Sequence, residues 1–386
     1  MSDLRIDRSV LVEELADLVR IDSTNPGLVP GGAGEGRIAS VIAERMEEIG
    51  LEVDVWAPLA DRPNVVGVLP GTGSGRSLML NAHTDTVGVE DMQSPFTPRI
   101  ESGRMYGRGT QDMKGSLAAQ LAAVRALKEM DETLAGDVVV AAVIDEEYKS
   151  RGTEAVLDRY DVDGAVVTEP TDMALALAHK GFVWVDVETR GRAAHGSRPD
   201  EGVDANMHMG RVLARLDALN QELRGRPGHP LVGAPSLHAA TIEGGSASSV
   251  YAAHCSLRIE WRTVPGQSET DVMDGIREIL EDLSEEHPTF EAQCRVAFAR
   301  EPFDVAADAM IVESVRQAAA DTRGEKPSVS GQTFWTDAAL LDAAGVETVV
   351  FGPKGAGLHT SEEWVDLDSV VDLAEILART AQQYCL

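Results

Sequence analysis

The chain has 386 residues, of which 43% are hydrophobic, so it is long enough for two packed cores and has the composition of a globular protein. Its 64 acidic and 34 basic side chains give a formal net charge of −30, which repels nucleic acid and anionic membranes and argues against both as partners. The first residues have no apolar signal-peptide core, and no run approaches the roughly 18 apolar residues of a membrane span. We therefore expect a cytoplasmic protein.

The first part of the chain alternates helical and strand patterns. Apolar spacing and turn residues predict, in order, helices at 9–20 and 37–49, strands at 51–55, 64–69 and 77–81, a helix at 116–130, and strands at 138–144 and 165–168. The run at 138–144 is unbroken, which is typical of a strand that is covered on both faces. These patterns predict an α/β fold whose central mixed sheet is flanked by helices.

The pattern changes at residue 182. From there to 299 the predicted order is β-α-β-β-α-β, that of the ferredoxin-like motif, with elements that begin near 182, 204, 236, 250, 269 and 290. We interpret residues 182–299 as an inserted domain, and residues 1–181 and 300–386 as two parts of one enclosing domain. The final part predicts helices at 308–320, 336–344 and 367–383 and a strand at 346–351.

Polar side chains that can bind metal follow the predicted strands of the enclosing domain. His83 and Asp85 follow the strand at 77–81, and period-two alternation places both on one face. Asp112 lies in a loop with three glycines at 107, 109 and 115, which lets the backbone approach a ligand closely, although a helix cap is the alternative interpretation. His-x-Asp is common by chance, so this pair alone predicts little.

Further carboxylates follow the next two strands. Glu146 and Glu147 belong to an acidic triplet after 138–144; such a triplet is costly to bury unless a cation meets it, and a solvated turn is the alternative. Glu169 follows 165–168, and His359 follows a glycine-rich loop near the C-terminal helix. Together, two imidazoles and several carboxylates form the donor set that suits two divalent ions, with zinc favoured by histidine.

The order of these motifs resembles one family. Six segments are similar to those of the co-catalytic zinc amidohydrolases and peptidases: His83-Thr84-Asp85, Gly107 to Gly115, Asp145-Glu146-Glu147, Thr168-Glu169-Pro170, Ala194-His195-Gly196-Ser197 and His359-Thr360-Ser361-Glu362. That family contains acetylornithine deacetylase, succinyl-diaminopimelate desuccinylase, aminoacylase and glutamate carboxypeptidase. The resemblance spans nearly the whole chain.

The resemblance implies a role for each matching residue. It implies that His83 and Glu169 bind one ion, that Glu147 and His359 bind the other, and that Asp112 bridges the two. Asp85 would orient His83, and Glu146 would be the general base. The family also implies that His195 reaches the active site of the partner subunit and stabilises the oxyanion there, so we expect a homodimer formed through the inserted domain, which also acts as a lid.

Substrate recognition is less specific in the sequence. Arg262 resembles a strand-borne arginine of the family that suits an α-carboxylate, and Ser249 stands where the family usually has an asparagine. The resemblance implies hydrolysis of the amide bond of a small N-acyl amino acid; a dipeptidase or carboxypeptidase would use the same ligands. Cobalt or manganese could replace zinc. A non-catalytic binding protein is the alternative from another class, but such a relative is expected to have lost a ligand or the base.

Overall fold

The computed structural model describes residues 4–89, 91–130 and 133–386. These residues form two compact units. The first contains the chain up to Leu177 together with Val305–Ser330 and Thr336–Leu386, and the second contains Ala178–Asp304 and Gly331–Trp335. The division into independent domains at 182 and 299 stays a prediction.

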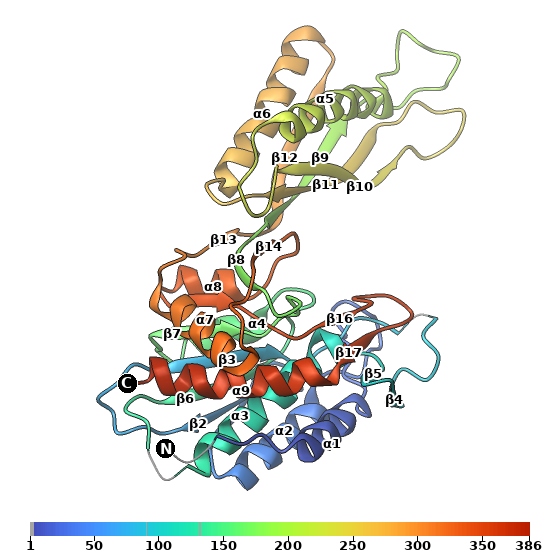
Figure 1. Cartoon of the computed structure of the whole chain (residues 1–386). Helices are drawn as coiled ribbons and strands as arrows, with labels where there is room; N and C mark the ends of the chain where they lie inside the picture. The colour runs from blue at the N-terminus through green and yellow to red at the C-terminus, as the bar shows by residue number, and fades with distance from the viewer. Residues whose placement is uncertain (1–3, 90, 131–132) are drawn as a thin grey trace. The chain divides into compact units, whose positions relative to one another are not determined.

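The first unit is built on a mixed sheet with the strand order β1-β2-β6-β3-β7-β15-β8 (Figure 1). Its strands are β1 (Glu52–Leu59), β2 (Arg62–Leu69), β3 (Leu78–His83), β6 (Val138–Val143), β7 (Gly164–Val167), β8 (Leu175–His179) and β15 (Glu347–Val350). Strand β3 pairs in parallel with β6 and β7, and β7 pairs in parallel with β15. The carboxyl ends of these strands therefore meet at one edge of the sheet, where the predicted ligands follow them.

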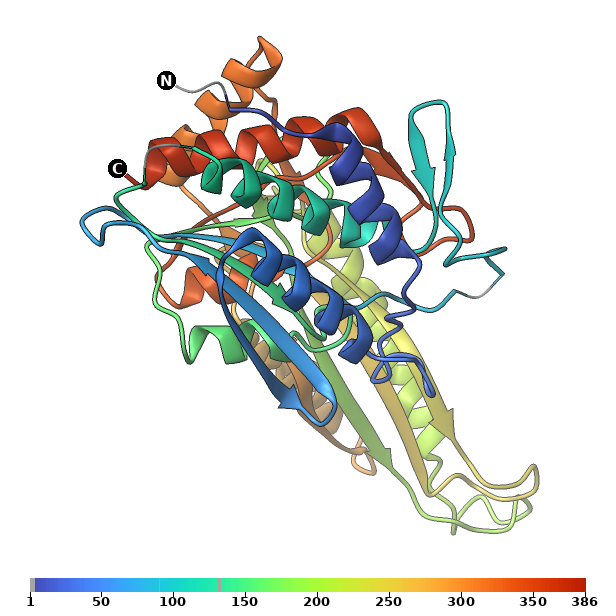
Figure 2. The same cartoon turned by 90° about the horizontal axis from the view of Figure 1, so that it is seen from below.

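Helices cover both faces of this sheet. One layer contains α1 (Arg8–Val19), α2 (Gly36–Ile49), α3 (Gly115–Lys128), α7 (Met310–Arg323) and α9 (Leu367–Tyr384). Figure 2 shows α1, α2, α3 and α9 side by side in front of the sheet. The other face carries α4 (Arg151–Leu157) and α8 (Ala338–Ala343). Because β3, β6 and β7 are buried along their whole length, both faces of the central strands supply core. The central mixed sheet and its flanking helices agree with the predicted α/β class.

Several short elements lie outside the predicted ones. They are α4, β8, the strands β13 (Phe303–Asp304) and β14 (Val329–Gln332) beside β8, and a small sheet of β16 (Gly355–Ala356), β17 (Trp364–Asp366), β5 (Arg104–Tyr106) and β4 (Arg99–Glu101). The strands of two or three residues among them carry too few side chains for a period to be recognised. The strand predicted to begin near residue 250 begins only at His254, because Tyr251 instead donates its main-chain N–H to the carbonyl of Ala194 in the loop before His195.

The second unit has the element order β9 (Gly181–Arg190), α5 (Ala205–Gly225), β10 (Ser236–Gly244), β11 (His254–Thr263), α6 (Glu269–Glu286) and β12 (Glu291–Arg300). Its antiparallel sheet has the order β10-β11-β9-β12. Alternate residues of β9, such as Val183 and Val185, are buried in a core with apolar side chains of α5 and α6. Both helices begin with side-chain caps, from Asp204 for α5 and from a Ser268–Asp271 capping box for α6.

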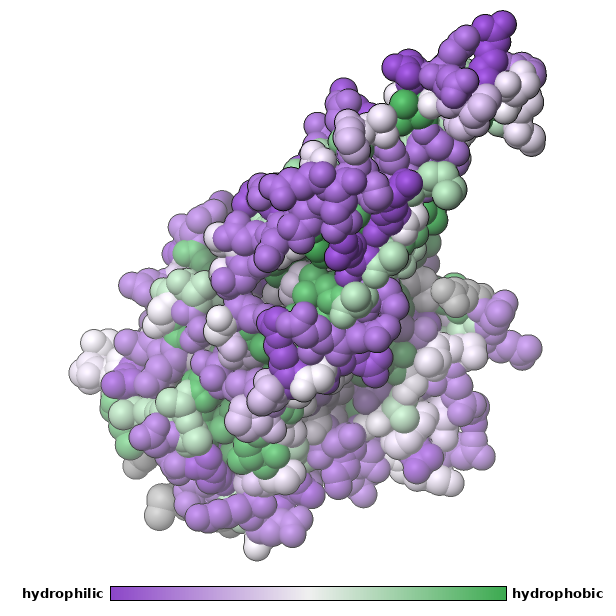
Figure 3. Space-filling view, turned by 90° about the horizontal axis from the view of Figure 1, so that it is seen from above, coloured by the Kyte–Doolittle hydropathy of each residue, from purple (hydrophilic) through white to green (hydrophobic). Residues whose placement is uncertain are grey.

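The surface is largely hydrophilic (Figure 3). Hydrophilic side chains cover most of the face seen in Figure 3, and hydrophobic residues form only small patches between them. Among the described residues, no helix combines the length and the apolar character needed to cross a bilayer.

Candidate metal centre

Five predicted ligands converge at the carboxyl edge of the first unit's sheet. His83 ends β3, Glu147 lies four residues after β6, Glu169 lies two residues after β7, and Asp112 and His359 come from loops. The two carboxylate oxygens of Asp112 face different histidines: Oδ1 lies 2.9 Å from His83 Nε2, and Oδ2 lies 3.3 Å from His359 Nε2. Asp112 thus occupies the middle of the cluster.

The remaining ligands lie on either side of Asp112. Glu169 Oε1 is 3.7 Å from His83 Nε2, whereas Glu147 Oε2 is 3.1 Å from His359 Nε2. Donor atoms of His83, Asp112 and Glu147 lie within 4.8 Å of one another, and so do those of His83, Glu146 and Glu169. The geometry therefore offers two adjoining groups of donors that share His83.

Asp85 lies behind this cluster and is fully buried. The Nδ1 atom of His83 lies 2.9 Å from the main-chain carbonyl of Asp85 and 3.7 Å from its carboxylate. Because a carbonyl oxygen only accepts, Nδ1 carries a proton, and Nε2, which faces Asp112, is the nitrogen that could bind a cation. The Asp85 carboxylate accepts the main-chain N–H groups of Glu146 and Glu147, each at 3.2 Å, so it fixes the turn that carries both residues.

Burial and like charges perturb the carboxyl groups. Burial raises the pKa of Glu169 well above its usual range, and the neighbouring Asp112 raises it further. Burial and the charge of Glu169 also raise the pKa of Glu146 well above its usual range. Burial raises the pKa of Glu147 to about 7, with Asp112 adding to the effect. Three carboxyl groups at one buried point therefore need positive charge if all are to ionise.

The histidines and Asp112 show the complementary effect. Hydrogen bonds to Asp112 and Glu147 raise the pKa of His359 to about 10. Burial lowers the pKa of His83, but the hydrogen bond to Asp112 and the charge of Glu169 outweigh it and leave the pKa well above its usual value. Burial likewise opposes ionisation of Asp112, yet hydrogen bonds from both histidines hold its pKa below the ordinary range. In the protein alone, imidazolium protons supply the positive charge that divalent cations supply when bound.

The donor set fits two divalent cations. It consists of two imidazoles and carboxylates, which suit zinc and related ions. Glu147 also has a buried oxygen, Oε1, that has no hydrogen-bond partner among the described residues. A buried carboxylate oxygen without a partner is costly, and coordination of a cation would satisfy it.

A protein-family comparison bears on this geometry. Residues 79–383 match the model of peptidase family M20/M25/M40. The chain belongs to this family. M20 proteins are metal-dependent hydrolases of amide and peptide bonds, so the chain is a hydrolase of this class.

Relatives of the M20 chain act on different compounds. It is 32% identical to acetylornithine deacetylase of Myxococcus xanthus, with 96% of each chain covered. It is 27% identical to N-formyl-4-amino-5-aminomethyl-2-methylpyrimidine deformylase of Halalkalibacterium halodurans, over 97% of this chain and 95% of the relative. In structure it is similar to aminopeptidase PepT of Bacillus cereus, with a TM-score of 0.80, 21% identity and coverage of 99% and 100%.

The other predicted site residues of the M20 chain lie in the second unit. His195 is exposed, and its Nδ1 accepts the main-chain N–H of Ser197 at 3.2 Å, so Nε2 is the N–H donor of the neutral ring. The loop of Ser249 lies beside that of His195, because Gly196 donates its main-chain N–H to Ser249 at 2.7 Å. Arg262 lies on β11, where its Nε donates to Glu260 at 2.6 Å.

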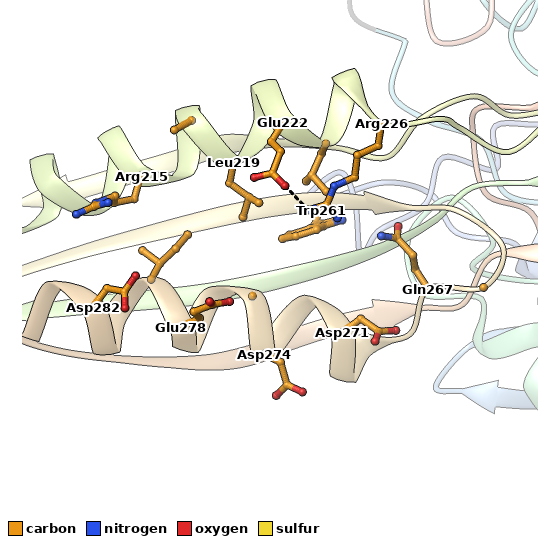
Figure 4. Close-up of a pocket in the computed structure, with 15 residues that line it drawn as sticks. Arg215, Leu219, Glu222, Arg226, Trp261, Gln267, Asp271, Asp274, Glu278 and Asp282 are labelled. Atoms are coloured by element: carbon orange, nitrogen blue, oxygen red, sulfur yellow. Dashed lines mark hydrogen bonds and ion pairs between the residues drawn. The ribbon is translucent and has the colours of Figure 1, made fainter.

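A separate groove lies between α5 and α6 of the second unit (Figure 4). Trp261, Leu219 and Leu223 contribute apolar surface to it, and acidic side chains including Glu222, Asp274, Glu278 and Asp282 surround it. None of the predicted metal ligands lines this groove. We therefore place the chemistry at the strand ends of the first unit.

Four residues that support the centre were not predicted as site residues. Asn25 donates its side-chain N–H to the Asp85 carboxylate at 2.7 Å, and Arg62 pairs with both Glu35 and Asp145. Arg108 and Glu363 join the loops of Asp112 and His359. Asn25 stands in a Ser-Thr-Asn-Pro-Gly segment that indicates only a turn. Glu363 directly follows the His359 motif, which is the one signal that could have identified it.

Proposed function

We propose that this M20 protein hydrolyses the amide bond of a small N-acyl amino acid by means of a water molecule activated between two divalent ions, with zinc as the favoured metal. The observation that carries the proposal is the position of Asp112, whose two carboxylate oxygens face His83 and His359 separately. Glu169 on the first side and Glu147 on the second would complete the two ligand sets. Bound ions would lower the pKa of the shared water and polarise the scissile carbonyl.

Glu146 is the proposed general base. Its main-chain N–H is fixed by the Asp85 carboxylate, and one of its carboxylate oxygens lies within 4.8 Å of donor atoms of both His83 and Glu169. Glu146 would take a proton from the attacking water and pass it to the leaving nitrogen, whereas Glu147 is committed as a ligand.

His195 would donate from Nε2 to the oxyanion that forms on the scissile carbonyl, from the partner subunit of a homodimer. Arg262 and Ser249 are the proposed contacts for the remainder of the substrate. Arg262 would have to exchange its bond to Glu260 for one to a substrate carboxylate.

An N-acyl amino acid is favoured over a peptide as the substrate, because the relative with the highest identity given above is an acetylornithine deacetylase. A dipeptidase or carboxypeptidase function is the second candidate, because it would use the same ligands and the structural likeness to aminopeptidase PepT covers 99% of this chain. We therefore expect hydrolysis of Nα-acetyl amino acids, N-acetylornithine included, at a higher kcat/KM than that of di- and tripeptides. The reverse ranking would favour the peptidase, and hydrolysis that persists after exhaustive chelation would refute the two-metal proposal.

Replacing Glu146 by Gln tests the base. The substitution keeps the size of the side chain but removes the proton acceptor, so kcat should fall at least 100-fold while two metal ions per chain are retained. Glu362→Gln is the matched control, because Glu362 is an exposed carboxylate outside the proposed ligand set. Metal content is measured by elemental analysis of both variants. Unchanged turnover in Glu146→Gln would exclude the assignment.

A further inference from the structure

The loops that carry Asp112 and His359 are joined by the carboxylate of Glu363, whose side chain is completely buried. One oxygen, Oε1, accepts the main-chain N–H of Gln111 at 2.8 Å and that of Asp112 at 3.1 Å. The other, Oε2, accepts the main-chain N–H of Gly109 at 3.0 Å and the Arg108 guanidinium at 2.8 Å. A single side chain therefore binds three main-chain N–H groups around the central carboxylate of the metal centre.

Arg108 completes the connection from the opposite direction. Its side chain is also buried, and its Nη2 donates to the carbonyl of Thr360, next to His359, at 3.0 Å. The same guanidinium donates from Nε to the carbonyl of Gly88 at 3.1 Å. Charge-assisted bonds of a planar guanidinium fix direction as well as distance. Arg108 thus contacts both the carboxylate of Glu363 and the main chain beside a proposed ligand.

The loop of His359 has few other means of being held in place. Within residues 357–363, Glu363 alone is buried, and the side chain of His359 is 54% exposed. Packing against a core therefore contributes little to the position of the His359 ring. A main-chain bond from the N–H of Gly107 to the carbonyl of Glu363, at 3.1 Å, also joins the two loops. The side-chain bonds of Glu363 and Arg108 add the contacts that reach Asp112 and Thr360.

We propose that Glu363, held by Arg108, is a positioning residue that sets the spacing between Asp112 and His359 for the ion that these two residues share. The inference rests on the proposed two-metal function. The carboxylate of Glu363 binds Arg108 and main-chain N–H groups, so it acts through the main chain of Asp112 and the loop of His359. Partners of this kind commonly change metal affinity 10- to 100-fold when they are removed.

The test compares metal binding by the full-length protein, wild type and variants, after chelator treatment. In Glu363→Gln one acceptor oxygen becomes an NH₂ group. Depending on which oxygen is replaced, the variant loses the acceptor for Gln111 and Asp112 or the acceptor for Gly109 and Arg108. Zn²⁺ is titrated against a chromophoric competitor, and the visible spectrum of bound Co²⁺ reports coordination. We expect the affinity for one of the two ions to fall 10- to 100-fold, with a changed Co²⁺ spectrum. Glu362→Gln removes the same charge one residue earlier, at an exposed position, and should bind both ions like the wild type.

Equal ion affinities for folded Glu363→Gln and the wild type would overturn the inference. A lower stability in urea together with unchanged ion affinities would mean that Glu363 has a purely structural role. An equal loss in Glu362→Gln would also overturn the inference. If Glu363→Gln does not fold, Arg108→Lys provides the test. This variant keeps the positive charge but loses the guanidinium group that reaches the carbonyl of Thr360. An unchanged metal affinity would refute the positioning role of Glu363 and Arg108. These titrations use no substrate. Failure of metal-loaded wild type to hydrolyse amides would therefore refute the proposed function without deciding this inference.

Discussion

Removal of Arg62 should destabilise the first unit more than removal of any exposed arginine. Arg62 is 8% exposed and binds Glu35 through two bonds, Nε at 2.7 Å and Nη2 at 2.6 Å. Its Nη1 also lies 2.9 Å from Asp145, in the turn that carries Glu146. In Arg62→Met the apolar stem is largely retained, whereas two buried carboxylates lose their cation.

Removal of one partner of a buried ion pair typically costs about 3–5 kcal/mol of unfolding free energy. Burial already raises the pKa of Glu35 even though Arg62 opposes the shift, and loss of Arg62 should raise it further. A carboxyl group whose pKa is higher in the folded state binds more protons when folded, so stability falls as pH rises above the unfolded value of about 4.3. The deficit of Arg62→Met should therefore be larger at pH 8 than at pH 5.5.

Urea unfolding followed by circular dichroism at both pH values measures this deficit. Arg8→Met is the matched control: its ion pair with Asp368 joins side chains that are 47% and 80% exposed, and such pairs contribute about 1 kcal/mol or less. The double variant Arg62→Met with Glu35→Gln should recover part of the loss. A loss in Arg62→Met no larger than in Arg8→Met, or one independent of pH, would refute the reasoning.

The perturbed pKa values and the exposed His195 ring each lead to an expected result. The metal-free protein should lose stability as pH rises from 6 to 9. The folded state binds more protons than the unfolded state across that range, because five pKa values are raised, those of His83, His359, Glu146, Glu147 and Glu169. Thermal unfolding with and without zinc measures this, and a pH dependence that zinc leaves unchanged would count against it. Cys385 is buried, and burial raises the pKa of its thiol to about 12, so folded protein should react with a thiol reagent at this residue only as fast as it unfolds. Above pH 9 this thiol should lower the free energy of unfolding by about 1.4 kcal/mol per pH unit, and Cys385→Ala should remove that part of the loss. Co-assembly of inactive His195→Ala and Glu146→Ala subunits should restore partial activity, measured against each variant alone; no recovery in a mixed dimer would exclude action of His195 across the interface.

The sequence predicted the parts of this protein that depend on short-range pattern. Buried parallel strands appear as continuous apolar runs, so β3 and β6 could be recognised along with the polar residues that follow them. Because the carboxyl ends of parallel strands share an edge, His83, Glu147 and Glu169 could be expected near one another from their places after such runs. The order of motifs then indicated the family.

Only the tertiary structure decided which groups support those ligands. Arg108 and Glu363 are 255 positions apart, and Asn25 and Asp85 are 60 apart, so no local period relates the members of either pair. The sequence predicted that the Asp85 side chain orients His83, whereas in the structure the Asp85 carbonyl lies nearer to the ring and the carboxylate binds the turn of Glu146 and Glu147. Such partners depend on how loops fold over the sheet edge and on which buried donors still need an acceptor there.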